Sequence, residues 1–391
     1  MKFLNIYTAS WAPSSTLHLK DYYRALAYWE SSNFKRSTIK TWVKDMEIEE
    51  IQYSSESINV IGGRFVNRLF FRVSEDGMII VGKNVEDAGK DSQRLDQFLS
   101  KKMNQLWDNL FSRGAALPKV FEEIESRHPV LITLSKAKPD DLDKVFRDFK
   151  VIPYKKIQLE KGEVWIGETL VIINNSDYSK EVTDKMVEHL LFARVYEIQL
   201  ERFVKGYEVL WNKVDGIRKQ SFIQQTELAH VHDLVLNIQS QASFFTARLN
   251  QMQHFLDWRR KLIDEYVVDP ALNATFKRFF MSLNSSQKYL QELWGMLTNY
   301  IRSTVSLMSF LYSDNERKNL ALLQKLFLIS TVAAIITLGG IAIIDLQRIV
   351  VFGGLAIVLS AFVHYLLFTV LSKYRKISLF KRDIELEKGK T

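Results

Sequence analysis

The stretch that decides the fold runs from residue 276 to 344 and begins Phe276-Lys-Arg-Phe-Phe-Met-Ser-Leu283. Apolar or weakly polar residues recur in it at alternating steps of three and four. This a/d pattern is typical of a helix that packs lengthwise against partner helices. No proline follows Pro270, so we predict one helix over the whole stretch. The positions of the pattern are Phe276, Phe279, Leu283, Ser286, Leu290, Leu293, Leu297, Tyr300, Thr304, Leu307 and Leu311.

The end of this helix is uniformly apolar. Leu326–Ile344 carries no charge and is long enough to cross a hydrocarbon core of about 30 Å. A second apolar run, Ile349–Leu371, follows after the short connection Asp345–Arg348. Lysine and arginine flank the two runs on one side, which favours cytoplasmic N- and C-termini. We therefore predict a C-terminal two-helix transmembrane hairpin in the cell inner membrane.

Composition bounds the remaining possibilities. The 391 residues have a formal net charge of +8 and no cysteine, which excludes disulfides and thiolate metal sites. The basic tail beside an apolar run indicates membrane topology rather than a duplex nucleic-acid partner. The predicted organisation is a cytoplasmic α+β domain (1–178), a long-helix stalk (179–325), a transmembrane hairpin (326–372) and a basic cytoplasmic tail (373–391).

Periodicity and turn residues predict the elements of the α+β domain. Glu75-Asp-Gly77 indicates a hairpin between strands 64–73 and 78–81. Further strands are expected at 3–8, 57–61 and 130–134, and the stretch 164–173, split by Gly167, is expected to form two strands or one kinked strand. Helices are expected at 19–29, 38–44, 91–111 and from Pro139 onward. Two long helices, 179–213 and 222–266, are expected before the final one.

Enzyme motifs are lacking, and the histidines show no metal-ligand spacing, so we expect no catalysis. Lys155 and Lys156, just after Pro153, could receive an anionic ligand such as a nucleotide phosphate. Arg64, Arg68 and Arg72 recur every four residues along a predicted strand and would share one face. For both groups the alternative is an ordinary solvated surface. Candidate ligand-binding residues are Arg64, Arg68, Lys155 and Lys156.

A stripe of small or weakly polar residues follows one face of the first apolar run. Such a stripe suits either close helix packing or the lining of a pore. The candidate pore-lining residues are Ser330, Ala334, Thr337, Ile341 and Asp345.

The stretch Asn319-Leu-Ala-Leu-Leu-Gln-Lys-Leu-Phe-Leu-Ile-Ser-Thr331, which leads to Thr337, resembles the membrane approach of the CorA family of divalent-cation channels. The predicted order of elements is also similar to that of the family. The Gly-Met-Asn signature of the family would fall at 344–346 and is absent, as is the proline of the first span, here Ile335. The resemblance implies a homopentamer whose first spans line a pore.

Three functions follow from this resemblance and from the pattern. The first is an oligomeric channel gated by a ligand on the cytoplasmic domain, for example a nucleotide second messenger. Divergent CorA-like proteins beside type III CRISPR systems have such a role in antiviral defence. The second is a divalent-cation (Mg²⁺ or Co²⁺) transporter, and the third is a non-conducting, membrane-anchored scaffold. Membrane lipid, a homopentamer and a small anionic ligand are the expected partners, and no cofactor is expected to be required.

Overall fold

The structure is a computed structural model of the 391-residue chain. It describes residues 2–11, 19–31, 34–55, 58–103, 124, 127–175, 177–220, 222–266, 269–341, 354, 358, 362, 365 and 376–378.

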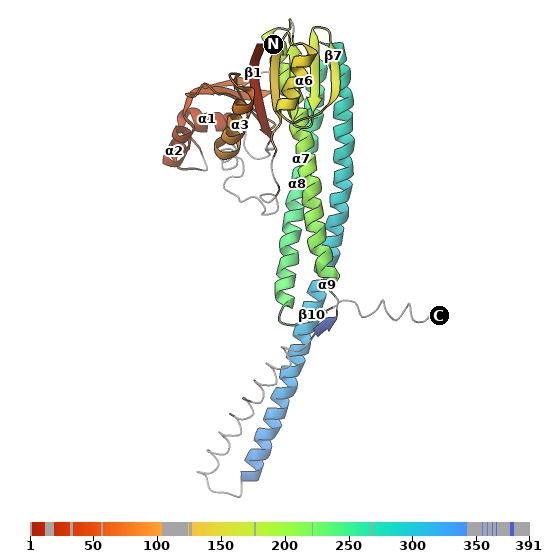
Figure 1. The fold of residues 1–391 in the computed structure, drawn as a ribbon. Coiled ribbons are helices and arrows are strands. Elements are labelled where there is room, and N and C mark those ends of the chain that lie inside the picture. The colour runs from red at the N-terminus through yellow and green to blue at the C-terminus, as the bar shows by residue number, and fades with distance from the viewer. Residues whose placement is uncertain are drawn as a thin grey trace, which may run out of the picture. The chain divides into compact units, whose positions relative to one another are not determined.

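A nine-stranded sheet organises the N-terminal part of the described chain (Figure 1). Its spatial order is β2-β3-β4-β5-β1-β6-β9-β8-β7, and every neighbouring pair is antiparallel except β6 and β9. The strands are β1 (Lys2–Trp11), β2 (Ile48–Ser55), β3 (Asn59–Phe65), β4 (Phe70–Ser74), β5 (Met78–Asn84), β6 (Val130–Ser135), β7 (Pro153–Leu159), β8 (Gly162–Gly167) and β9 (Leu170–Asn175).

The predicted hairpin at Glu75–Gly77 is confirmed, because β4 and β5 pair on either side of it. The single strand predicted over 64–73 is wrong. It consists of the end of β3, a turn and β4, and Arg68 in that turn has a left-handed backbone with φ of 64°. Gly62 and Gly63 lie inside β3 rather than in a turn.

Short helices cover one face of the sheet. They are α1 (Leu19–Tyr28), α2 (Arg36–Met46), α3 (Ala88–Phe98) with the single π-turn η1 (Leu99–Met103), and α6 (Pro139–Asp148). Alternation along each strand sends Phe71 and Val73 of β4 toward these helices, where they pack with Leu95 and Tyr22 in the main core. Residues of opposite parity, such as Arg72, therefore lie on the other face.

Three long helices complete the fold: α7 (Lys180–Arg218), α8 (Leu228–Tyr266) and α9 (Pro270–Ile341). The helix predicted from residue 222 begins later, because Phe222–Gln224 forms strand β10, paired with β11 (Lys376–Ser378). The helices belong in part to each of two compact units. Unit 1 comprises Met1–Tyr207 and Phe244–Trp294, and unit 2 comprises Glu208–Ser243 and Gly295–Thr391.

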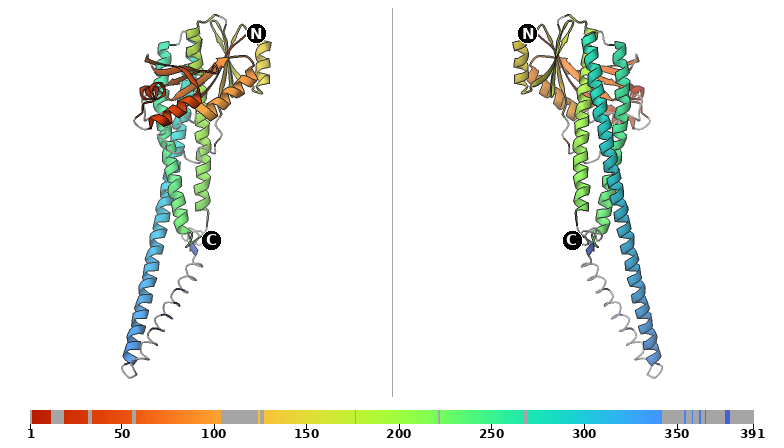
Figure 2. Two further views of the ribbon diagram at one scale, coloured as in Figure 1. Left: turned by 90° about the vertical axis from the view of Figure 1, so that its left-hand side faces the viewer. Right: turned by 90° about the vertical axis from the view of Figure 1, so that its right-hand side faces the viewer.

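Within unit 1 the three helices run alongside one another, as both views of Figure 2 show. The Phe245 ring of α8 stacks on Trp294 of α9 at 4.7 Å, and Phe192 of α7 stacks on Phe280 of α9 at 6.0 Å. Trp11 of β1 stacks on Tyr196 of α7 at 5.1 Å, which ties the second face of the sheet to the helices. Within unit 2, Trp211 stacks on Tyr300 at 4.8 Å.

The a/d pattern on α9 is half right. Positions 276, 283, 290, 297 and 304 are buried as predicted, but the intervening buried positions lie one residue later than expected. Phe280, Gln287, Trp294, Ile301 and Met308 are buried in place of residues 279, 286, 293, 300 and 307. At Trp294 and Gln287 this seam contacts α7 and α8 of the same chain, so it does not by itself require a second copy. The homopentamer stays a prediction.

The prediction of a C-terminal transmembrane hairpin is wrong. Across the described residues, no helix is both long and apolar enough to cross a membrane. The described part of the first apolar run, Leu326–Ile341, ends with α9 after sixteen residues. The absence of a helix of that kind among the described residues overturns the predicted hairpin and the inner-membrane location. Most of the second run, 349–371, lies outside the described residues.

Candidate binding cavity

A cavity of about 510 Å³ lies within unit 1, between the sheet and the start of α7. Strands β1 to β5 supply its floor, α7 supplies most of the opposite wall, and α8 contributes Arg259 and Leu262. The other lining residues are Tyr7, Gln52, Ser54, Ile58, Val60, Gly62, Phe70, Phe71, Arg72, Ile80, Glu181, Asp184, Lys185, Val187, Glu188 and His189.

Sheet register builds the floor. Gln52 of β2 pairs with Gly62 of β3, Gly62 pairs with Arg72 of β4, and Arg72 pairs with Ile80 of β5. Residues that oppose each other in an antiparallel pair share a face, so these four side-chain positions form one row across the floor. A Cβ added at Gly62 would meet no neighbouring heavy atom closer than 3.9 Å. The glycine therefore leaves open space beside Arg72.

Two aromatic rings form the apolar part of the floor. Tyr7 and Phe70 meet edge to face, with ring centroids 5.6 Å apart. Gly82 lies between them in the register, and a Cβ there would come within 2.6 Å of the Phe70 ring and 2.8 Å of the Tyr7 ring. Glycine at this position is what allows both rings to lie against the strand.

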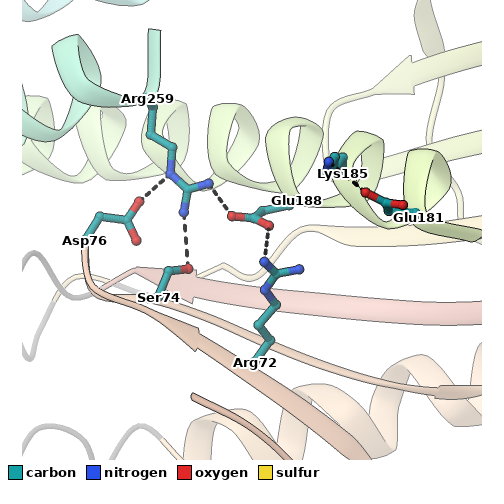
Figure 3. A network of polar contacts seen from close by, with 7 residues as sticks. All are labelled: Arg72, Ser74, Asp76, Glu181, Lys185, Glu188 and Arg259. Carbon is teal, nitrogen blue, oxygen red and sulfur yellow. Dashed lines mark hydrogen bonds and ion pairs between the residues drawn. The ribbon is translucent and has the colours of Figure 1, made fainter. Parts of the chain in front are cut away.

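On the helical side of the cavity, Arg259 of α8 holds a buried ion cluster (Figure 3). Its Nε donates to Asp76 Oδ2 at 2.6 Å, one Nη donates to Ser74 Oγ at 3.1 Å, and the other Nη donates to Glu188. Burial opposes the charge of Arg259, but Asp76 and Glu188 outweigh it and raise the pKa of the guanidinium. The cluster joins the β4–β5 hairpin, α7 and α8 at one point.

Glu188 belongs to both the cluster and the cavity. One of its carboxylate oxygens accepts from Arg259, and the other lies 3.0 Å from an Nη of Arg72 (Figure 3). Burial would raise the pKa of Glu188, but Arg259 and Arg72 lower it to about 2. Glu188 is therefore ionised at neutral pH and carries its negative charge against the cavity wall.

Arg72 is bound at only one of its three nitrogens. Its side chain is 38% exposed, and Glu188 is its one ion-pair partner among the described residues. The Nε atom is buried and has no hydrogen-bond partner in the described part of the chain. A guanidinium offers five donor hydrogens in a planar fork that suits carboxylates and phosphates. Arg72 thus keeps donors available inside a cavity.

His189 presents a second buried nitrogen, its Nδ1, that has no hydrogen-bond partner in the part of the chain that the structure describes. Burial and the positive charge of Arg259 lower the pKa of His189 to about 4, so the imidazole is neutral at pH 7. On the same helix Asp184 is half-buried, and burial raises the pKa of its carboxyl group. Lys185 is paired with Glu181 at 3.0 Å.

The candidate ligand-binding residues that the sequence suggested lie toward opposite ends of the strand order in the sheet. Arg64 of β3 and Arg68 of the following turn are exposed and do not line the cavity, although Arg64 shares a sheet face with Arg72. Lys155 and Lys156 lie on β7, the last strand at the other edge. The structure does not bring the two groups together.

The pore candidates lie on α9 as far as Ile341. Ser330 donates its hydroxyl to the carbonyl of Phe327 at 2.9 Å, and Ala334 is exposed. Thr337 and Ile341 are helical, and Asp345 is outside the described residues. The pore-lining role of these residues stays a prediction.

Sequence reasoning named Arg72 only as one member of a basic row and missed Glu188 and Arg259. A signal for the buried charges existed, because Glu188 and His189 stand directly before the apolar run Leu190-Leu-Phe192 of a long helix. Among the described residues, no group of three or more His, Cys, Asp or Glu side chains could hold a metal ion. In comparisons with known proteins, no family model matches this chain and no curated protein matches it.

Proposed function

We propose that unit 1 is a binding module for a small anionic ligand of nucleotide size, held in the cavity between the sheet and α7. The carrying observation is Arg72, a partly exposed guanidinium on the cavity floor whose buried Nε has no partner among the described residues. An unsatisfied buried donor is costly, and an anionic ligand would satisfy it. The channel and transporter hypotheses required the hairpin and are not carried forward.

The size and lining of the cavity support this ligand class. Its volume of about 510 Å³ falls within the range of about 300–1,000 Å³ that is typical of small-molecule sites. Tyr7 and Phe70 offer an apolar surface for a flat group such as a base, and Gln52 and Ser54 offer neutral hydrogen-bonding groups. A ligand that joins one anionic group to a flat, polar-edged ring uses all of these features.

The test is isothermal titration calorimetry with 5′-monophosphates and 3′,5′-cyclic monophosphates of the four common ribonucleosides. At least one should bind, and Arg72→Gln should weaken that binding by about 100-fold, since a charge-assisted pair contributes about 1.5–3 kcal/mol.

Arg64→Gln is the matched control, because Arg64 has the same side chain on the same sheet face but lies outside the cavity. It should leave the dissociation constant unchanged. No binding by any of the eight compounds, or equal losses in both variants, would contradict the proposal.

A further inference from the structure

The charges that line the cavity balance. Three cations (Arg72, Lys185 and Arg259) face three carboxylates (Glu181, Asp184 and Glu188). Lys185 pairs with Glu181, and Arg259 is occupied by Glu188, Asp76 and Ser74. What remains for a ligand is the incomplete pairing of Arg72 and the carboxyl group of Asp184, which forms no hydrogen bond with the described residues. The cavity is therefore not a general polyanion site.

Glu188 and Asp184 lie on the same wall of α7, four residues apart and thus one turn apart on one face of the helix. Glu188 contacts the guanidinium of Arg72 directly, so an anion bound to Arg72 comes close to a buried negative charge. In a partly desolvated site like charges repel far more strongly than in water. A singly charged group can accept hydrogen bonds from the remaining donors of Arg72, whereas a second negative charge meets Glu188 and Asp184 with no further unpaired cation among the described lining residues.

From this balance we infer that the carboxylates of Glu188 and Asp184 restrict the site to ligands whose anionic group carries a single negative charge. Suitable groups are a phosphodiester, a cyclic phosphate or a carboxylate, and a terminal phosphomonoester is disfavoured. Selection of this kind works by a repulsive element against the wrong ligand as well as by attraction to the right one. The inference rests on the proposed function, because it needs an anion at Arg72.

The test compares the cyclic and the 5′-monophosphate of the best-binding nucleoside from the panel above. At pH 7.5 the cyclic compound carries one negative charge and the 5′-compound carries nearly two. In the wild type the cyclic compound should bind at least about tenfold more tightly. The informative readout is the dissociation constant of the 5′-compound divided by that of the cyclic compound. This ratio is compared between variants, because conformational differences between the two compounds then cancel.

Asp184→Asn should lower this ratio about threefold, and Glu188→Gln should lower it about tenfold, since Glu188 contacts Arg72. Glu49→Gln on the exposed side of β2 removes the same charge outside the cavity and should leave the ratio unchanged. Because Glu188 also partners Arg259, Glu188→Gln is measured only after its near-ultraviolet circular dichroism matches the wild type. If it does not fold, Asp184→Asn decides alone.

The outcomes separate the two proposals. Binding that depends on Arg72, with a ratio that is equal in the wild type, Asp184→Asn and every folded Glu188→Gln sample, overturns the charge restriction and leaves the binding site intact. A wild type that prefers the doubly charged compound overturns it as well. Absence of any binding overturns the proposed function itself.

Discussion

The two halves of the nine-stranded sheet hold their cations in different ways. At the β7 edge, Lys156 lies 2.7 Å from Glu163 and over the Trp165 ring, while Lys155 lies over Phe279. In the β2–β5 half, Arg72 has one partner and open space beside it at Gly62. Lys155 and Lys156 are engaged in structural contacts, whereas Arg72 keeps donors without a partner among the described residues. This difference shows that an anion-binding site is better indicated by a cation with unused hydrogen-bond donors than by the presence of a cation alone.

The largest expected effect concerns the cluster behind the cavity. Arg259→Met would leave Asp76 and Glu188 buried without their cation, and breaking a buried pair in this way costs about 3–5 kcal/mol. Urea-induced unfolding at pH 7.5 measures the loss. Arg194→Met is the comparison within α7, because the partner Glu197 of Arg194 is 38% exposed and can regain water. Its loss should be clearly smaller, and equal losses would contradict this account of the cluster.

His189 gives the next effect, through pH. Its pKa is about 4 in the folded chain against an ordinary value of 6.5, so the unfolded chain binds more protons between these values. Stability is therefore complete above about pH 6.5 and falls as pH drops toward 4, by about 3 kcal/mol in total. Glu188, whose pKa is also lowered, adds a further loss below about pH 4.5.

His189→Gln should remove the first of these losses. Its unfolding free energy should change by about 3 kcal/mol less than that of the wild type between pH 6.5 and 4. His254→Gln, at an exposed position on α8, should retain the wild-type slope. A slope that survives His189→Gln would place the acid sensitivity in other groups.

Periodicity was sufficient for the parts of the fold that repeat. The long helices and the β4–β5 hairpin follow from apolar spacing and from Glu75-Asp-Gly77. The strand β2 was not predicted, because Ile48–Ser55 is a mostly polar edge strand whose burial pattern is weak. On α9 one position of the shifted series is Gln287, a buried polar side chain that donates to the carbonyl of Leu249. A hydropathy pattern gives no reason to place a glutamine inside.

The cavity could not be predicted for a related reason. Arg72, Glu188 and Arg259 are distant in the sequence and meet only through strand register and helix packing. The rule of equal spacing grouped Arg72 with Arg64 and Arg68, although the turn at Arg68 breaks the strand between them. Gly62 lies inside β3 and leaves space on a sheet face, which no sequence spacing indicates. The spacing of residues in the sequence predicts which side chains share a face only where those residues belong to one continuous strand or helix.

The neighbouring glycines of β3 sharpen the comparison further. A Cβ at Gly63 would overlap the carbonyl oxygen of Glu50 and lie 2.6 Å from Phe71 Cε1, so Gly63→Ala should destabilise the chain by about 1–3 kcal/mol. Gly62→Ala meets no such contact, and its stability change should stay below about 1 kcal/mol. Thermal unfolding of the two variants tests whether Gly63→Ala destabilises the chain more than Gly62→Ala does. An equal loss of stability in both variants would contradict this prediction. Gly62→Val should in addition weaken ligand binding, because its side chain enters the cavity.

The smallest effect is expected at the β7 edge, where the sequence had placed an anion site. Lys156→Gln removes a partly exposed pair with Glu163, and such pairs contribute about 0.2–1 kcal/mol. Lys155→Gln removes a cation–π contact of similar size at a partly exposed position. Because both lysines lie at the far edge of the sheet order from β2–β4, the double variant should bind the best ligand of the calorimetric panel with an unchanged dissociation constant. A loss of affinity as large as that of Arg72→Gln would instead place the anion site at β7. Lys155 and Lys156 would then have to break their present contacts in order to bind the ligand.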